Sequence, residues 1–187
     1  MNRILKLLFV LPLIILVVVV VIGLTGKSEK REKLPRPTIG EPARDFSFPD
    51  LDGREVSLSD FYGKKVVFLN IWATWCTSCK KELPTVQKMY EKLKGDDFEV
   101  LAVSIDTLGK KVVVPFMKKY RLTFPPLLNT TGSIQLLYGT TGVPESFIID
   151  KQGNIAYVEI GPGDWREHEK QSLIKGLMKE PDLEVIK

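Results

Sequence analysis

The sequence predicts an α/β domain with a central mixed β-sheet flanked by helices, preceded by an N-terminal β-hairpin extension and a transmembrane anchor. Three observations support this prediction. The N-terminal region contains one long uncharged apolar run, two turn sequences lie between short strand-like segments, and apolar strand-like runs alternate with helical patterns along the rest of the 187 residues. A chain of this length can bury one sizeable core.

Residues 1–26 are expected to anchor the chain in a membrane. Within them, the 18 residues 7–24 carry no charge, and about 20 apolar residues cross a bilayer core. A cleaved signal peptide is the alternative, because residues 21–23 are a tolerable cleavage sequence, although the apolar regions of signal peptides are usually shorter. Residues 27–38 hold charges and two prolines and predict a short extended linker before a domain over residues 39–187.

Two β-hairpins are predicted from turn sequences. Residues 46–48 and 56–58 flank Asp52-Gly53, which is a strong hairpin signal. Residues 147–149 and 155–158 flank a second turn sequence that contains Gly and Asn. The first hairpin is expected to precede the central sheet and the second to belong to it.

The remaining elements alternate between strand and helix. Residues 66–71 and 98–105 are apolar runs typical of strands buried on both faces. Residues 80–94 have the apolar spacing of a helix, and residues 110–120 predict another helix, unless it begins only at its single proline. Residues 165–178 predict an amphipathic C-terminal helix. Strands and helices in this order predict a mixed sheet with helices on both faces.

The formal net charge of +4 is unevenly distributed. Seven basic and two acidic residues precede Ile39, whereas 20 basic residues face 21 acidic ones from Ile39 onward. A nucleic-acid-binding domain needs a basic face, so the composition of the domain argues against nucleic acid as a partner. Two basic residues precede the apolar run and four follow it closely, so the positive-inside rule alone favours the cytoplasmic side for the domain or sets no orientation.

Cys76 and Cys79 are the only cysteines in the chain, and they lie three residues apart between a predicted strand and a predicted helix. A C-x-x-C near a β-α-β pattern is typical of a redox motif. At a helix N-terminus, free N–H groups and the helix dipole favour an anion, so the thiol pKa of Cys76 should fall below that of a free cysteine. Cys76 would then attack disulfides as a thiolate, and Cys79, one turn deeper, would act as the resolving thiol.

Two simpler interpretations of the cysteine pair are weaker. A structural zinc site takes four ligands, and neither the two cysteines nor the single His168 can supply them, so no metal is expected. A purely structural disulfide that closes such a short loop would restrict little chain entropy.

A set of motifs resembles the thioredoxin-like proteins of the TlpA/ResA and CcmG (DsbE) type over about residues 39–178. The motifs are Trp-Ala-Thr-Trp-Cys-x-x-Cys-Lys at residues 72–80, then Glu82 and Pro84, and later Gly-Val-Pro-Glu-Ser-Phe-Ile-Ile-Asp at residues 142–150. The resemblance implies a thioredoxin-like fold and thiol–disulfide oxidoreductase activity without a cofactor.

The resemblance also implies roles for individual residues. Pro84 should kink its helix, and Pro144 should be the cis-proline that faces the disulfide. Glu82 should accept a proton and raise the cysteine pKa values by like-charge repulsion; the alternative is a solvated carboxylate on a helix face. Glu145 follows the proline as in the CcmG type, and a surface acid is its alternative.

Further residues are expected to form the substrate-binding surface, and Trp75 would lie beside the disulfide while Trp72 belongs to the core. The expected surface comprises Trp75, Thr77, Ser78, Val143, Pro144 and Glu145. The two residues between the cysteines should also influence the reduction potential.

The expected function is reduction of disulfides, such as those of the apocytochrome c haem-binding cysteines, at the outer face of a bacterial inner membrane. The resemblance also implies that a membrane electron donor of the CcdA/DsbD type regenerates the dithiol. A general envelope disulfide reductase or isomerase is the alternative.

Hypotheses from other classes fit less well. A thiol peroxidase resembling the peroxiredoxins would have Pro and Thr where this chain has Leu69 and Ala73. A copper chaperone of similar fold would have a C-x-x-x-C motif and a nearby His, whereas this chain has C-x-x-C and its His168 lies in the predicted C-terminal helix. A non-catalytic binding module would require the cysteines to be idle.

Overall fold

The structure is a computed structural model that describes residues 14, 17 and 32–181. The expected anchor, residues 1–26, lies outside the described residues except for Ile14 and Val17. In the described part of the chain, no helix has the length and apolar character needed to cross a membrane.

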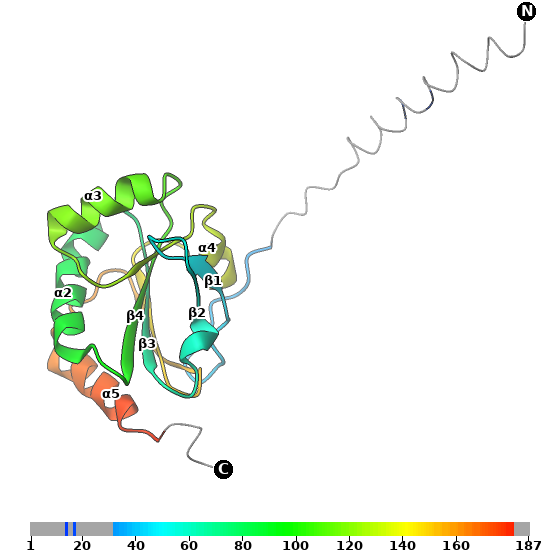
Figure 1. Ribbon diagram of the computed structural model, residues 1–187. Helices are drawn as coiled ribbons and strands as arrows, with labels where there is room; N and C mark the ends of the chain where they lie inside the picture. Colours follow the sequence, from blue (N-terminus) through cyan, green and yellow to red (C-terminus); the bar gives the residue numbers. More distant parts are fainter. Residues whose placement is uncertain (1–13, 15–16, 18–31, 182–187) are drawn as a thin grey trace, which may run out of the picture. The chain divides into compact units, whose positions relative to one another are not determined.

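A five-stranded mixed sheet forms the centre of the domain (Figure 1). Its strands are β3 (Val66–Trp72), β4 (Phe98–Ser104), β5 (Pro126–Leu128), β6 (Glu145–Ile149) and β7 (Ile155–Ile160), in the order β5-β4-β3-β6-β7. The central strand β3 pairs parallel with β4 and antiparallel with β6, so the predicted mixed sheet is confirmed. All seven residues of β3 are buried, as expected for a strand covered on both faces.

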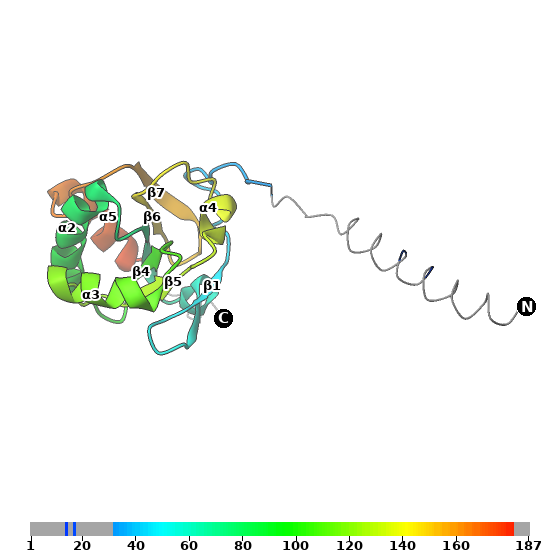
Figure 2. The ribbon, with the colours of Figure 1, turned by 90° about the horizontal axis from the view of Figure 1, so that it is seen from above.

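Helices cover both faces of the sheet (Figure 2). They are α2 (Thr77–Leu93), α3 (Lys110–Tyr120), α4 (Ser133–Leu137) and α5 (His168–Met178), with a short 3-10 helix η1 (Leu58–Phe61). Helices α2 and α5 lie on one side of the sheet, and α4 lies on the other. The rings of Phe68 in β3 and Trp165 before α5 pack at 4.4 Å, whereas Tyr138 after α4 packs on Phe147 of β6 at 5.0 Å.

The N-terminal hairpin is confirmed and forms a separate two-stranded sheet. Strands β1 (Ser47–Pro49) and β2 (Glu55–Ser57) pair antiparallel around the predicted turn, where Gly53 adopts φ +82°. Such a left-handed conformation favours glycine. The second predicted hairpin is also confirmed, since β6 and β7 pair antiparallel.

Several predicted boundaries need correction. Helix α2 begins at Thr77, three residues before the apolar pattern, because the Cys76 side chain caps it. Helix α3 contains Pro115 in its interior and does not begin there. Helix α5 begins only at His168, because Trp165 is buried in the loop before it. Strand β5 and helix α4, of three and five residues, were not predicted because they are too short to show a period.

Part of the expected linker belongs to the domain. The Leu34 amide donates to the Leu136 carbonyl at 3.0 Å, and Pro37 is buried. The domain therefore begins before Ile39, at about Lys33.

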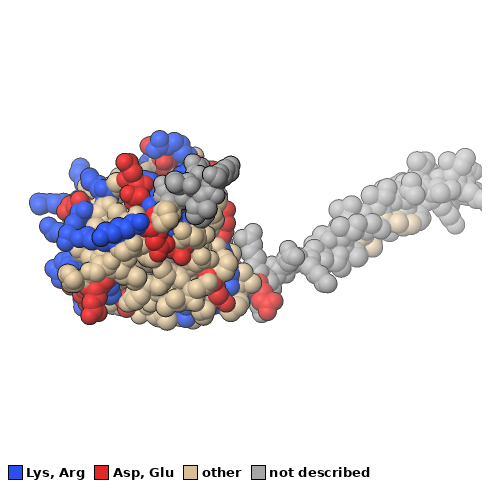
Figure 3. Space-filling model, turned by 90° about the horizontal axis from the view of Figure 1, so that it is seen from below, with Lys and Arg blue, Asp and Glu red and all other residues tan. Residues whose placement is uncertain are grey.

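On the face shown in Figure 3, basic side chains gather toward one side of the domain with acidic ones among them.

Candidate active site

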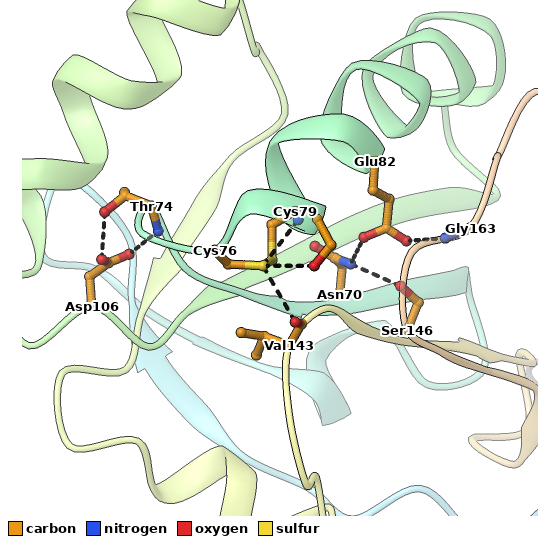
Figure 4. Close-up of a disulfide and its surroundings, with 10 residues drawn as sticks. Asn70, Thr74, Cys76, Cys79, Glu82, Asp106, Val143, Ser146 and Gly163 are labelled. Atoms are coloured by element: carbon orange, nitrogen blue, oxygen red, sulfur yellow. Dashed lines mark hydrogen bonds between the residues drawn. A yellow bond between two sulfur atoms is a disulfide. The ribbon is translucent and has the colours of Figure 1, made fainter.

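The two cysteines form a disulfide at the N-terminus of α2 (Figure 4). Their Cα atoms lie 5.3 Å apart. Cys76 is the N-cap of the helix, with extended φ and ψ of −76° and 117°, and its Sγ accepts a hydrogen bond from the Cys79 amide at 3.0 Å. An N-cap position satisfies a free helix N–H group, so the local geometry places one sulfur where a thiolate would be stabilised after reduction.

The surroundings of the two sulfurs differ in exposure. Cys79 is fully buried and Cys76 is 5% exposed. Next to them, Trp75 is 63% exposed and Thr77 is exposed, while the Ser78 hydroxyl lies 3.4 Å from Cys76 Sγ. Cys76 is therefore the more exposed of the two cysteines, and Trp75, the residue before it in the sequence, exposes most of its side chain. Trp72 is fully buried, as expected for a core residue.

The loop before β6 faces the disulfide. The Val143–Pro144 peptide bond is cis, which confirms the expectation for Pro144. The Val143 carbonyl oxygen lies 3.4 Å from Cys76 Sγ. Antiparallel pairing of β6 with β3 brings this loop to the end of β3, from which the cysteine loop also departs.

Glu82 is buried, so the alternative of a solvated carboxylate is wrong. Its side chain is 1% exposed, and its Oε1 accepts hydrogen bonds from Trp165 Nε1 at 2.8 Å and the Gly163 amide at 3.1 Å. Asn70 Nδ2 donates to the other oxygen at 3.3 Å. Burial raises the pKa of the Glu82 carboxyl above its ordinary value, and these hydrogen bonds partly oppose the rise.

Glu82 shares one side of α2 with Cys79, because residues three apart lie on neighbouring positions of a helix surface. Pro84, two residues further on, lies inside the same helix. The buried carboxyl and the buried cysteine therefore lie on the same side of one helix.

Glu145 is also buried, and both expectations for it need correction. It is 1% exposed and forms an ion pair with Arg36. A second hydrogen bond joins Arg36 Nη2 to the other carboxylate oxygen at 3.3 Å. The side chain is thus neither a surface acid nor free to touch a substrate.

A further acid that the sequence analysis did not single out, Asp106, holds the loop that carries the cysteines. It is 4% exposed and accepts hydrogen bonds from the Thr74 amide at 2.9 Å and the Thr74 hydroxyl at 2.6 Å. The Ser104 hydroxyl donates to it at 2.8 Å. Figure 4 shows this cluster on one side of the disulfide and the Glu82 cluster on the other.

Residues 39–158 match the AhpC/TSA family, which is most of the domain. The chain belongs to this family. Its relatives in this family include thiol–disulfide oxidoreductases of the ResA type. It is 41% identical over 117 residues to thiol-disulfide oxidoreductase ResA of Bacillus thuringiensis subsp. konkukian, a match that spans 63% of this chain and 66% of that relative.

Other comparisons agree on the fold of this AhpC/TSA-family chain. ResA of Bacillus subtilis is 36% identical over 139 residues, covering 73% of this chain and 75% of that relative. A DsbE-like thiol:disulfide interchange protein from Chlorobium tepidum superposes with a TM-score of 0.68 at 30% identity, covering 76% of this chain and 99% of the other. StoA of Bacillus subtilis gives a TM-score of 0.59 at 29% identity, over 71% of this chain and 98% of that one. The fold is thioredoxin-like.

Several site residues of this family member were missed by the sequence analysis. Asn70 could have been noticed, because it is the one polar residue in the apolar run of β3. Asp106 also carries a signal, since it follows the strand parallel to β3 and the ends of parallel strands meet at one edge. The contact of Trp165 with Glu82 spans 83 residues and has no local signal. Within residues 32–181, no three His, Cys, Asp or Glu side chains are grouped to hold a metal ion.

Proposed function

We propose that this chain is an extracytoplasmic thiol–disulfide oxidoreductase that reduces disulfides in other proteins. The observation that carries the proposal is the Cys76–Cys79 disulfide at the N-terminus of α2, in which Cys76 is 5% exposed and Cys79 is fully buried. The exposed Trp75 ring and the Val143 carbonyl flank it and would contact an extended substrate.

The reaction would start from the dithiol form. The Cys76 thiolate attacks one sulfur of a substrate disulfide, a mixed disulfide forms, and the other substrate sulfur leaves as a thiolate. Cys79 then attacks Cys76 Sγ and releases the second substrate sulfur. Two electrons pass to the substrate, and the chain is left with the disulfide present in the structure.

Glu82 would serve the resolving step. Cys79 must lose its proton before it can attack, and Glu82 is the buried carboxyl three residues further along the same helix. A carboxyl whose pKa is raised by burial is a better proton acceptor near neutral pH than an ordinary one. Membership of the ResA-type oxidoreductases supports the reaction class.

The haem-binding cysteines of apocytochrome c are the substrate that we propose first, with a CcdA/DsbD-type membrane protein as electron donor. The second candidate is a general envelope disulfide reductase or isomerase, which the likeness to a DsbE-like interchange protein also favours. Residues 1–26 would hold the chain in a bacterial inner membrane as a single-pass anchor, with the domain on the extracytoplasmic side. Their uncharged apolar run supports the anchor, and the redox cysteine pair favours the extracytoplasmic side, where disulfides form readily.

A thiol peroxidase remains the alternative that the AhpC/TSA match itself suggests. Leu69 and Ala73 are fully buried apolar residues, so Leu69 stands in place of the proline of a peroxidatic site and Ala73 lacks the threonine hydroxyl. Consumption of hydrogen peroxide by the reduced chain at a rate matching its reduction of insulin would favour the peroxidase.

Trapping of the mixed disulfide tests the proposal directly. In the full-length chain, Cys79→Ala should accumulate covalent adducts with partners because the resolving thiol is absent, and Cys76→Ala serves as the control that should form none. Recovery of apocytochrome c in the adducts would support the first candidate. Adducts with unrelated envelope proteins alone would favour the second, and no adducts together with no insulin reduction would contradict the oxidoreductase.

A further inference from the structure

Residues 34–37, here called the N-terminal strap, are built into the domain. The Leu34 amide donates to the Leu136 carbonyl at 3.0 Å, and Arg44 Nη1 donates to the Pro35 carbonyl at 2.7 Å. The same Arg44 nitrogen also donates to the Leu137 carbonyl of α4. One guanidinium therefore joins the strap to α4. The strap lies outside residues 39–158, which match the family, so family membership assigns no role to it.

Gly139 shows how closely the strap approaches the loop before β6. It adopts φ +63°, and a Cβ placed there would lie 2.5 Å from the Arg36 nitrogen and 2.6 Å from the Leu34 carbonyl oxygen. Both are backbone atoms, which cannot move aside as a flexible side chain could. Glycine at this position thus allows the strap to pack against the loop.

The strap also places the positively charged Arg36 at the start of β6. Arg36 Nε and Nη2 donate to the two carboxylate oxygens of Glu145, the fork-like arrangement that guanidinium and carboxylate groups favour. The Glu145 side chain is 1% exposed, whereas that of Arg36 is 26% exposed. Hydrogen bonding to Glu145 raises the pKa of Arg36.

We propose that Arg36 is a positioning residue for the substrate-binding edge formed by Val143 and Pro144. Glu145 is bonded directly to Pro144, and the Val143 carbonyl lies 3.4 Å from Cys76 Sγ. A buried carboxylate without its cation is strongly unfavourable, so loss of Arg36 would drive Glu145 toward water and displace the edge beside the disulfide. This inference rests on the proposed function, because the edge matters only if a protein disulfide docks there.

The test compares two disulfides of different size in the full-length chain. Insulin must dock along the edge, whereas dithiodipyridine needs only access to a sulfur. Arg36→Met should raise the KM for insulin by about tenfold, since a displacement of about 1 Å can cost on the order of 100-fold in rate. Its rate with dithiodipyridine should change less than twofold.

Three variants serve as controls. Arg36→Lys keeps the charge but not the fork and should give an intermediate KM. Arg36→Met combined with Glu145→Gln should recover part of the loss, because no unpaired charge remains buried. Arg54→Met removes an arginine whose side chain is 76% exposed and which pairs with Asp50 near the first hairpin, and it should leave both rates unchanged.

The outcomes separate the two proposals. Insulin left intact by the unmodified chain would overturn both the proposed function and the role of Arg36. An unmodified chain that reduces insulin, with Arg36→Met at the same KM or with equal losses for both disulfides, would overturn the role of Arg36 alone. If Arg36→Met does not fold, the other two variants decide. A wild-type KM in Arg36→Lys, together with a KM raised by tenfold or more in the double variant, would then overturn the role of Arg36.

Discussion

Glu82 and Glu145 are equally buried, each 1% exposed, yet they have different kinds of partner. Glu145 faces a guanidinium, that of Arg36. The partners that the structure gives Glu82 are neutral N–H groups, from Trp165, Gly163 and Asn70. Burial raises the pKa of Glu82. These two buried carboxyl groups are thus suited to different tasks.

The difference shows that burial alone does not define the role of an acid in this site. A cation that satisfies a carboxylate makes it a fixed structural charge. When the partners of a buried carboxyl are neutral donors, burial remains the dominant influence on its pKa and raises it. A carboxyl with a raised pKa can exchange a proton near neutral pH. Glu82 is therefore suited to proton transfer, and Glu145 is suited to holding its loop in place.

The largest effect is expected from removing the cation. Arg36→Met should lower the free energy of unfolding by about 3 kcal/mol, the lower end of the range for breaking a buried pair, because Arg36 itself is partly exposed. Guanidinium unfolding of the oxidised chain measures it. Arg54→Met removes a 76% exposed arginine whose partner Asp50 is 13% exposed, and should leave the midpoint unchanged. Equal losses in the two variants would contradict the distinction between the more buried pair and the more exposed one.

A smaller effect is expected from removing a neutral donor. Trp165→Phe deletes the Nε1–H group that donates to Glu82 and should cost about 2 kcal/mol through the lost hydrogen bond and the smaller ring. The pKa of Glu82 should rise further, because this hydrogen bond lowers it. The loss should therefore be larger at pH 8 than at low pH, and a pH-independent loss would mean that only packing was disturbed.

The elements around the cysteines could be predicted because their signals are local. The C-x-x-C motif, the strand before it and the helix after it lie within about 30 residues of one another. Pro144 was placed by resemblance, and its cis bond is confirmed. In each of these cases, neighbouring residues in the sequence are neighbours in the site or match a short motif.

The contacts that define the two glutamates could not be predicted, because they join distant segments. Arg36 lies 109 residues from Glu145, and Trp165 lies 83 residues from Glu82. Charges and prolines made residues 27–38 resemble a solvated linker, whereas Pro37 is buried and the strap packs on α4. Tertiary packing determines these positions, and no local pattern in the sequence reports it.

A still smaller effect on the free energy of unfolding is expected from the titration of Glu82. Because its folded pKa lies above the ordinary value of 4.5, the folded state holds this proton where the unfolded chain has already released it. The stability from this group is complete below pH 4.5 and is lost as the pH rises through the folded pKa, with a slope of at most about 1.4 kcal/mol per pH unit.

Glu82→Gln cannot titrate, so the difference in unfolding free energy between it and the unmodified chain should follow that slope. Unfolding from pH 4 to pH 9 measures the difference. A constant difference over this range would show that Glu82 does not change its protonation on folding.

Titration of the thiols in the reduced chain tests the contrast between the glutamates most directly. Thiolate absorbance followed against pH should show that Glu82→Gln lowers a cysteine pKa by on the order of one unit, because it removes a nearby like charge. Glu145→Gln should leave the titration unchanged, since Arg36 already balances that carboxylate. Identical titrations of the unmodified chain and Glu82→Gln, or an equal shift in both variants, would contradict the assignment of Glu82 as the acid coupled to the cysteines.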